Sequence, residues 1–136
     1  MTAPIISPRR KPIPKGQLLI NGEWVDARDG ATMPTMDPTT EETITTVAKA
    51  SASDAEAAID AASRAYEQGP WGKMRHEDRA RILFKMADLL DERAEDFAIR
   101  EAMDMGMPYT DFISIIMPHC SGLFRFFAGQ AMVHMD

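Results

Sequence analysis

Histidine and cysteine side chains are the first candidates for chemistry, and His119 and Cys120 stand side by side. A cysteine nucleophile needs a base in hydrogen-bond contact with its thiol, whereas adjacent residues of a helix point about 100° apart. The remaining histidines, His76 and His134, lack a partner at a metal-ligating spacing. Cys120 is the only cysteine, which excludes an internal disulfide and a cysteine-built zinc site. We expect a structural Cys120 in a reducing compartment, with a cytoplasmic location.

Carboxylates are the second candidates, because an acidic group occurs at Asp91, Glu92, Glu95 and Asp96. Two of them could act as an acid and a base, but a solvated helix face is the simpler interpretation. The sequence has no Gly-x-Gly-x-x-Gly, Walker loop or His-x-x-x-His, and residues 69–72 read Gly-Pro-Trp-Gly, a turn. Residue chemistry alone therefore indicates no active site.

The charge distribution separates the first residues from the rest. The chain has 136 residues and a net charge of −6, yet residues 1–15 contain four basic residues, four prolines and no acidic residue. No secretory apolar run follows Arg9 and Arg10, and the prolines oppose an amphipathic transit helix. We predict a flexible basic arm over residues 1–16, with a binding tail as the alternative, and a structured part over 17–136. The acidic remainder argues against nucleic acid as a partner.

Two strand hairpins are expected to open the structured part. Asn21-Gly22 stands between the apolar runs 18–20 and 23–25, and this dipeptide favours a type I′ turn. Extended runs around 32–36 and 43–48 follow, with turn-forming residues over 37–40 between them. The second of these runs is rich in threonine and other β-branched residues, which favours a strand.

Helical spacing of apolar residues begins after Ser51. Ser53 and Glu56 have the spacing of a capping box, and Gly69-Pro70 is expected to end the first helix. A second, longer helix is predicted from about residue 76 to residue 104, with glycine and proline beyond its end. Its expected buried stripe consists of Ala80, Leu83, Phe84, Ala87, Leu90, Ala94, Phe97 and Ala98.

The last segment is apolar on all sides. Pro108 is a plausible first helical residue, and Arg125 is the single charge between Phe112 and Phe127. The stretch is interrupted by Pro118 and is expected to be too short for a membrane span. A helix with no polar face must be buried all round, and little else in the chain could cover it. We expect the opening section of a larger fold.

A family resemblance rests on an ordered set of short motifs. They are INGEW, DPTTEETI, an alanine-rich helix before PW, an arginine-and-leucine helix ending in ADLL, GMPY and RFFAG. This order, over about residues 17–133, resembles the amino-terminal section of NAD(P)-dependent aldehyde dehydrogenases. The family usually has Asn-Pro-x-Thr-Gly-Glu where this chain has residues 37–42, and Asn-Gly-Lys-Pro where it has residues 105–108.

The resemblance implies an α/β fold. Strand hairpins plus three helices would form the opening part of a Rossmann-type cofactor domain, incomplete on its own. The whole enzyme would oxidise an aldehyde to a carboxylic acid with NAD or NADP, as a homodimer or homotetramer. The family's catalytic residues lie beyond this chain, so its partner would be the remainder of the same enzyme.

The resemblance also assigns two sets of residues. Ile115 and His119 fall on positions that line the aldehyde entry passage, although both residues could equally pack in a core. Asp104 and the backbone carbonyl of Met36 fall on positions that hold a monovalent cation, sodium or potassium, with a third ligand beyond the chain. Alternatively, Asp104 is a solvated acid at a helix end.

A non-enzymatic alternative remains open at this stage. The same Met- and Phe-rich last helix could bind a partner protein, which would make the chain an interaction module.

Overall fold

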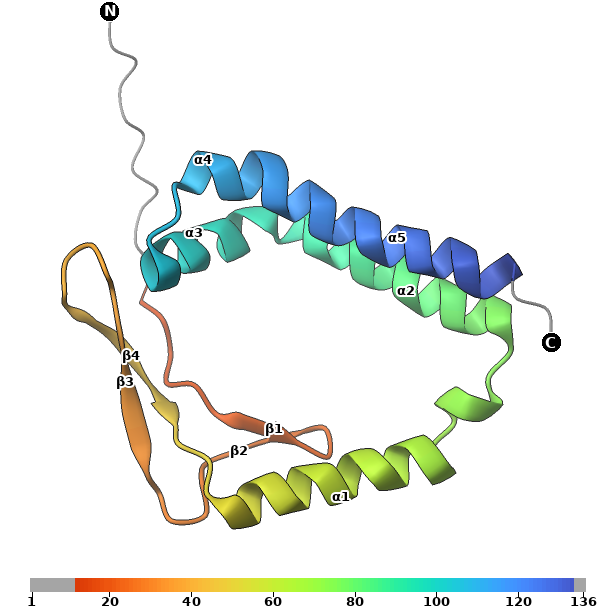
Figure 1. Ribbon diagram of the computed structural model, residues 1–136, viewed down its shortest axis with the longest axis horizontal. Coiled ribbons are helices and arrows are strands. Elements are labelled where there is room, and N and C mark those ends of the chain that lie inside the picture. Colours follow the sequence, from red (N-terminus) through yellow and green to blue (C-terminus); the bar gives the residue numbers. More distant parts are fainter. Residues whose placement is uncertain (1–11, 134–136) are drawn as a thin grey trace, which may run out of the picture.

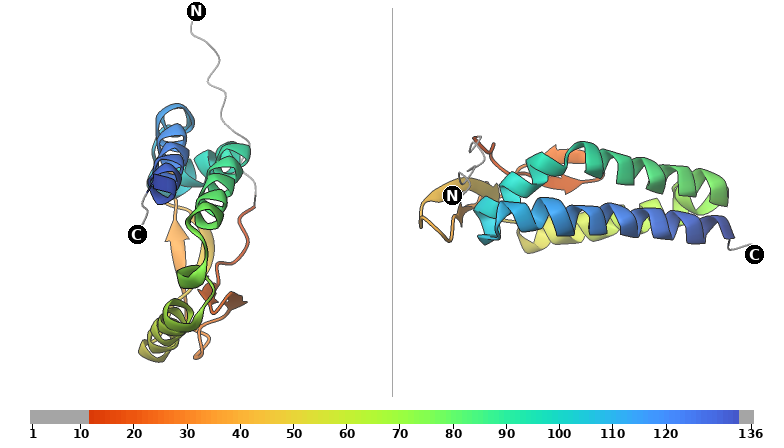
Figure 2. Two further views of the ribbon diagram at one scale, coloured as in Figure 1. Left: turned by 90° about the vertical axis from the view of Figure 1, so that its right-hand side faces the viewer. Right: turned by 90° about the horizontal axis from the view of Figure 1, so that it is seen from above.

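The computed structural model describes residues 12–133, which form an open ring of secondary-structure elements (Figure 1). The strand hairpins and α1 make one half of the ring, and the helices from α2 onward make the other. α2 and α5 lie side by side along the second half (Figure 2). The expected α/β arrangement of hairpins and helices is confirmed.

The first hairpin agrees with the sequence prediction. β1 (Leu18–Ile20) pairs antiparallel with β2 (Glu23–Val25). Asn21 and Gly22 both have positive φ, 54° and 81°, as a type I′ turn requires.

The second hairpin contains a turn held by an aspartate. β3 (Thr32–Met36) pairs antiparallel with β4 (Thr43–Ala48), with an irregularity between Thr35 and Met36. The buried Asp37 carboxylate accepts hydrogen bonds from the N–H groups of Thr39 at 2.8 Å and Thr40 at 3.3 Å. Glu41, which stands where the family usually has glycine, adopts the left-handed backbone of that position with a φ of 59°.

The predicted basic arm falls mainly outside the described residues. Within them, the Gly16 N–H donates to the Thr46 carbonyl at 2.9 Å, and the Ala48 N–H donates to the Gly16 carbonyl at 2.8 Å. Lys15 also forms an ion pair with Asp26 at 3.0 Å. The boundary of the arm at residue 16 stays a prediction.

The N-cap of the first helix, α1 (Ala52–Gln68), lies two residues earlier than predicted. The N-cap is Ser51, and its capping-box partner is Asp54, so the prediction of Ser53 with Glu56 is wrong. Ser51 has the extended backbone of an N-cap, and Asp54 is additionally held by the Arg28 N–H at 3.3 Å. That second tie comes from a distant loop. The end at Gly69 is confirmed.

A single helix over residues 76–104 was expected, and the structure corrects this. After a short 3₁₀ turn, η1 (Trp71–Lys73), α2 (His76–Glu92) ends at Arg93, and α3 (Ala94–Met105) begins after it. Arg93 leaves the helical region with φ −109° and ψ 12°. α3 ends at Gly106, whose φ of 74° is left-handed, as expected for a terminating glycine.

The last segment is one continuous helix of three parts. These are α4 (Tyr109–Asp111), the π-helical turn η2 (Phe112–Ile116) and α5 (Met117–Val133). Pro108 is the N-cap rather than the first helical residue. Pro118 does not interrupt the helix, so the expectation of a broken, shorter segment is wrong. Tyr109–Val133 has the length and composition to cross a membrane, a test that core helices of soluble proteins also pass.

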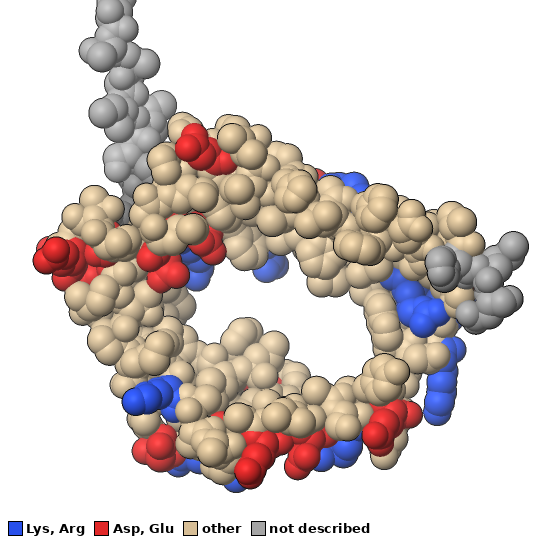
Figure 3. Space-filling model, in the orientation of Figure 1, with Lys and Arg blue, Asp and Glu red and all other residues tan. Residues whose placement is uncertain are grey.

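Few residues are buried. The buried apolar residues are Ala27, Ala61, Ala80, Ala87, Ala98, Ile99, Phe112, Met117 and Ala128. The accessible surface is 10285 Å² for 15.1 kDa, against about 7,100 Å² for a typical monomer of that mass. An opening runs through the centre of the ring (Figure 3). The predicted stripe of residues 76–104 is therefore only partly buried, since Phe84 and Phe97 remain 37% and 40% exposed.

Candidate functional site

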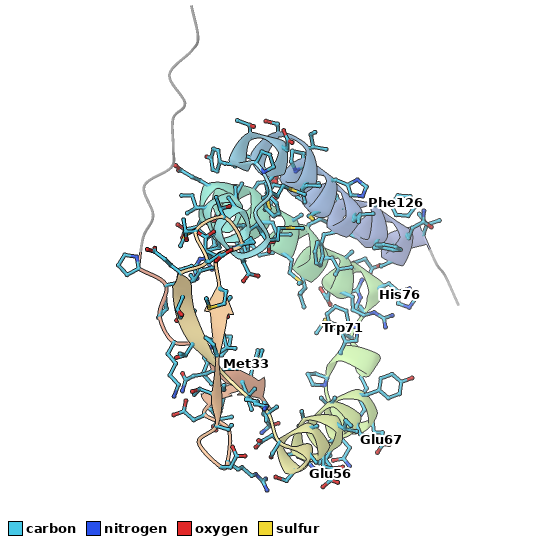
Figure 4. The ribbon with its side chains drawn as sticks, turned by 60° about the vertical axis from the view of Figure 1, so that its left-hand side comes forward. Met33, Glu56, Glu67, Trp71, His76 and Phe126 are labelled. Carbon is cyan, nitrogen blue, oxygen red and sulfur yellow. The ribbon has the colours of Figure 1, made fainter. Side chains whose placement is uncertain are left out.

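The outward face of the last helix carries the two residues assigned to the aldehyde passage. Ile115 is 63% exposed, and His119 is exposed one turn later. Leu123 continues the same face at 44% exposure, and Phe126 projects from α5 away from the ring (Figure 4). No described residue covers the side chain of Ile115 or His119. Within residues 12–133, these two side chains therefore do not pack in a core.

Cys120 does not lie on this face. It is half-buried, whereas the neighbouring His119 is exposed. Adjacent helical side chains diverge by about 100°, so His119 is poorly placed to act as a base for the thiol. The arrangement agrees with a structural cysteine.

The residues assigned to a cation come from two elements that meet. Met36 ends β3, and Asp104 is exposed in the last turn of α3. Two residues beyond each of them, Gly106 lies close to Pro38, because a Cβ added at Gly106 would lie 3.1 Å from Pro38 Cγ. A carboxylate, a strand-end carbonyl and the carbonyls of a helix C-terminus supply the oxygen ligands that hard cations take. Among the described residues, no three His, Cys, Asp or Glu side chains gather around one metal position.

A cavity of about 230 Å³ lies beside this junction. Asp37 and Glu42 from the second turn and Met103 from α3 line it, together with Pro12, Ile13, Thr43 and Ile44. The cavity shows that the second hairpin and α3 leave space between them.

Part of the acidic group has a role that the sequence did not reveal. Asp91 and Asp88 both accept hydrogen bonds from Arg125 Nη2, at 2.7 and 2.9 Å, and so tie α2 to α5. Hydrogen bonds from Ser121 and then from Arg125 hold the pKa of Asp91 below its usual value. The two carboxylates, Asp91 first, raise the pKa of Arg125. Asp91 is therefore an ion-pair residue on a helix face that stays solvated, since its side chain is 47% exposed.

Asp54 is a buried carboxylate, and its role is to stabilise the structure. Its buried side chain accepts from the Ser51 N–H at 2.9 Å and from the Ser51 hydroxyl at 2.7 Å. The Arg28 guanidinium lies 3.7 Å away. The bonds from Ser51, backbone first, and then the Arg28 N–H lower the pKa of Asp54. The signal for this cap was present in the sequence, because Ser51-x-x-Asp54 also fits the capping-box spacing.

Comparison with known proteins decides the family. The model of the aldehyde dehydrogenase family matches residues 24–136. The chain belongs to this family. The resemblance drawn from the ordered motifs is thereby confirmed, and the chain is an amino-terminal portion of an aldehyde dehydrogenase.

Individual relatives give the extent of the match. Aldehyde dehydrogenase family 2 member B4, mitochondrial, of Arabidopsis thaliana is 44% identical over 115 residues, which are 85% of the chain and 21% of the relative. The cytosolic 10-formyltetrahydrofolate dehydrogenase of Xenopus tropicalis is 42% identical over 113 residues, 83% of the chain and 12% of the relative. The relatives thus include mitochondrial and cytosolic proteins.

Solved structures agree with the sequence match. The NAD⁺ complex of aldehyde dehydrogenase from Bacillus cereus superimposes with a TM-score of 0.86 at 36% identity. The superposition covers 89% of the chain and 25% of that protein. The chain therefore spans about a quarter of this structure and about a fifth or less of the two curated relatives.

Proposed function

We propose that the chain is the opening part of an enzyme that oxidises an aldehyde to a carboxylic acid with NAD or NADP. The observation that carries this proposal is the exposed apolar face of the last helix, on a chain whose family is known. Ile115, Leu123, Phe126 and Phe127 are each more than 40% exposed. In the proposed enzyme the remainder of the same polypeptide covers part of this face, and the aldehyde passage takes the rest.

The chain's own share in the reaction is to form one wall of the passage. Ile115 and His119 stand one turn apart and outward, so they would contact an entering aldehyde. The transferred hydride goes to the nicotinamide cofactor when that is bound. The described residues provide binding surface, while the nucleophile and base belong to the remainder.

A monovalent cation fits the junction of β3 and α3. Asp104 and the Met36 carbonyl would hold sodium or potassium there, with a third ligand from the remainder. An acid in the last turn of a helix is otherwise unfavourable, because the helix dipole is negative at that end. In the whole enzyme, Asp104→Asn should remove the dependence of thermal stability on these salts. An unchanged rise of the midpoint with either salt would leave Asp104 as a solvated acid.

The remaining assignments follow from family membership. The proposed enzyme is cytoplasmic, acts without a membrane or nucleic-acid partner and assembles as a homodimer or homotetramer; the cytosolic relative from Xenopus tropicalis supports the location. The interaction module remains the alternative. In the proposed enzyme the same polypeptide covers the last helix, whereas in the module a different protein would cover it.

A chimaeric enzyme tests the proposal directly. Residues 12–133 replace the matching quarter of the Bacillus cereus enzyme, and aldehyde-dependent NADH formation is measured. We expect activity from this chimaera and none from the 136-residue chain alone. An inactive but folded chimaera would contradict the proposal. Turnover by the isolated chain that disappears in Cys120→Ala would contradict the assignment of the nucleophile to the remainder.

A further inference from the structure

The turn of the first hairpin contains a dipeptide that can react with itself. Asn21 is the only asparagine of the chain, and Gly22 follows it. The backbone nitrogen of glycine is the least hindered one that can follow an asparagine, and a Cβ added at Gly22 would meet no atom within 4 Å. This nitrogen can attack the side-chain amide carbon, Cγ, of Asn21 and close a five-membered ring. Residue types and open space thus favour chemistry at this turn.

The reaction has two steps and requires only the protein and water. The Gly22 nitrogen forms a bond to Asn21 Cγ, loses its proton and expels the side-chain nitrogen as ammonia, which leaves a succinimide ring. Water then adds to one of the ring carbonyl carbons and opens the ring. If the bond from Cγ to the Gly22 nitrogen breaks, the product is aspartate. If the bond from the backbone carbonyl carbon breaks, the product is isoaspartate, in which the chain continues through the side chain.

The closed turn keeps the two reacting atoms apart. Asn21 has a φ of 54° and Gly22 a φ of 81°, so both residues have the left-handed backbone of a type I′ turn. In this conformation the Cβ atom of a residue lies close to the carbonyl oxygen that follows it. The oxygen and the next nitrogen are on opposite sides of the carbonyl carbon, so the Asn21 side chain is directed away from the Gly22 nitrogen. Ring closure therefore requires Asn21 to leave the turn conformation.

The hairpin that holds this turn is small. β1 and β2 have three residues each and form a sheet of two strands in the described part of the chain. Such a hairpin is only marginally stable in water. Leu19 lies directly opposite Trp24, and this cross-strand pair is 57% and 67% exposed. Elements with few buried contacts open locally at a low cost in free energy, so we expect the turn to open while the rest of the chain stays folded.

A second turn contains a similar dipeptide that is held more firmly. Gly30 follows Asp29 and has a φ of 70°. The Gly30 N–H donates to the carbonyl of the buried Ala27 at 2.8 Å, which engages the nitrogen that would attack. The Asp29 carboxylate accepts from the Ala31 N–H at 2.9 Å, which fixes the side chain that would be attacked. This turn therefore offers an internal comparison for the reactivity of Asn21.

We propose that Asn21 is a self-modification site that converts to aspartate and isoaspartate when the first hairpin opens. Either product adds a negative charge two residues before Glu23. Aspartate tolerates the left-handed backbone of the turn, so this product leaves the hairpin closed. Isoaspartate inserts a methylene group into the backbone, which a two-residue type I′ turn does not accommodate. The products accumulate, so their amount records for how long the hairpin has been open.

Peptide mapping of the 136-residue chain tests the site. The chain is kept at neutral pH, folded in buffer or unfolded in urea, and the peptides that contain Asn21 or either product are separated over time. We expect both products in both samples, with a slower reaction in buffer because the turn must first open. Equal rates would overturn the protection by the turn. A folded chain that forms no product while the unfolded chain is converted would overturn the site. The chimaeric enzyme should give the same order of rates, and the reverse order there would also overturn the protection.

Three variants test whether the hairpin controls the reaction. Trp24→Ala removes the cross-strand pair and should speed the loss of Asn21 in the folded chain about twofold to fivefold. Tyr66→Ala is the matched control, because it truncates an aromatic side chain that is 86% exposed on α1, and the rate should stay unchanged. Asp29→Asn places a second asparagine before a glycine, in the firmer turn, and this site should react more slowly than Asn21. An unchanged rate in Trp24→Ala, or a faster reaction at the second site, would overturn the control by hairpin opening.

Discussion

The two halves of the ring hold their structure in different ways. In the half of β1–β4 and α1, polar groups near in sequence satisfy one another: Asn21-Gly22 turns the first hairpin, Asp37 holds the second, and Ser51 caps the helix. In the half of α2–α5, the helices meet through alanines and one arginine with two carboxylates. Large apolar side chains stay exposed in both halves, among them Trp24, Ile59 and Tyr66 in the first and Ile115, Phe126 and Phe127 in the second. The first half is therefore fixed by local polar contacts and the second by contacts between helices, and both leave apolar surface for further protein to cover.

Charge follows the same division. Glu56 and Glu67 project from α1 away from the ring opening, toward solvent (Figure 4). The last helix has a single charge from Phe112 to Phe127, and that charge, Arg125, is used against α2. A helix face with charged residues is stable in contact with water, whereas an apolar face has to be covered by other protein.

The largest effect should come from the junction that joins the two halves. Gly106→Ala places a side chain at a φ of 74° and 3.1 Å from Pro38 Cγ, which should cost about 1–3 kcal/mol. Gly122→Ala is the matched control, since no atom lies within 4 Å of its added Cβ, and it should stabilise by about 0.5–1 kcal/mol. Urea denaturation of the chimaeric enzyme measures both. Equal effects would mean that the junction does not constrain the glycine.

The second largest effect should be a loss of stability in acid, caused by protonation of Asp54 in the half of β1–β4 and α1. Its folded-state pKa is lowered by Ser51 and Arg28, so its stabilisation is present above the unfolded value, about 3.9. That stabilisation is lost as the pH falls through the lower, folded value. The difference in denaturation midpoint between the parent and Asp54→Asn should therefore be present at pH 7 and shrink in acid. A difference independent of pH would show that the charge is not what stabilises this cap.

The choice of helix cap gives a smaller effect. Ser51→Ala removes the N-cap hydroxyl and should cost about 1 kcal/mol. Ser53→Ala, at the position that the sequence pattern favoured, should cost much less, because Ser53 only shares a hydroxyl contact of 2.9 Å with Ser51. The two variants are compared by urea denaturation. A larger cost at Ser53 would restore the original cap assignment.

The smallest effect is expected in the helical half. Arg125→Met removes both ion pairs to α2, but the three side chains are 39–56% exposed, so solvent and salt screen them. The denaturation midpoint should fall slightly at low salt and match the parent at 1 M NaCl. Arg81→Met is the control, since its partner Asp78 lies on the same helix. A salt-independent loss in Arg125→Met would mean that packing of the side chain stem matters more than its charge.

The same division explains what the sequence could predict. The bounds of both hairpins and the end of α1 follow from Asn21-Gly22, β-branched runs and Gly69-Pro70, which act within a few residues. The break at Arg93 and the π-turn depend on how α2, α3 and the last helix fit together, and no local pattern encodes that fit. Phe112 and Met117, five residues apart and before Pro118, were the available signal for the π-turn. The passage and cation residues were assigned only by resemblance, because no spacing or composition around them marks a site.

Self-association of the isolated 136-residue chain most directly tests whether the helical half is completed only by further protein surface. The last helix exposes Ile115, Leu123, Phe126 and Phe127 on its outer side, and exposed apolar patches mark surfaces that associate with other protein. Light scattering should show a mass that rises with concentration, with binding of a dye that reports apolar surface, and Phe126→Glu with Phe127→Glu should reduce both signals. A stable monomer at high concentration that binds no dye would contradict the account.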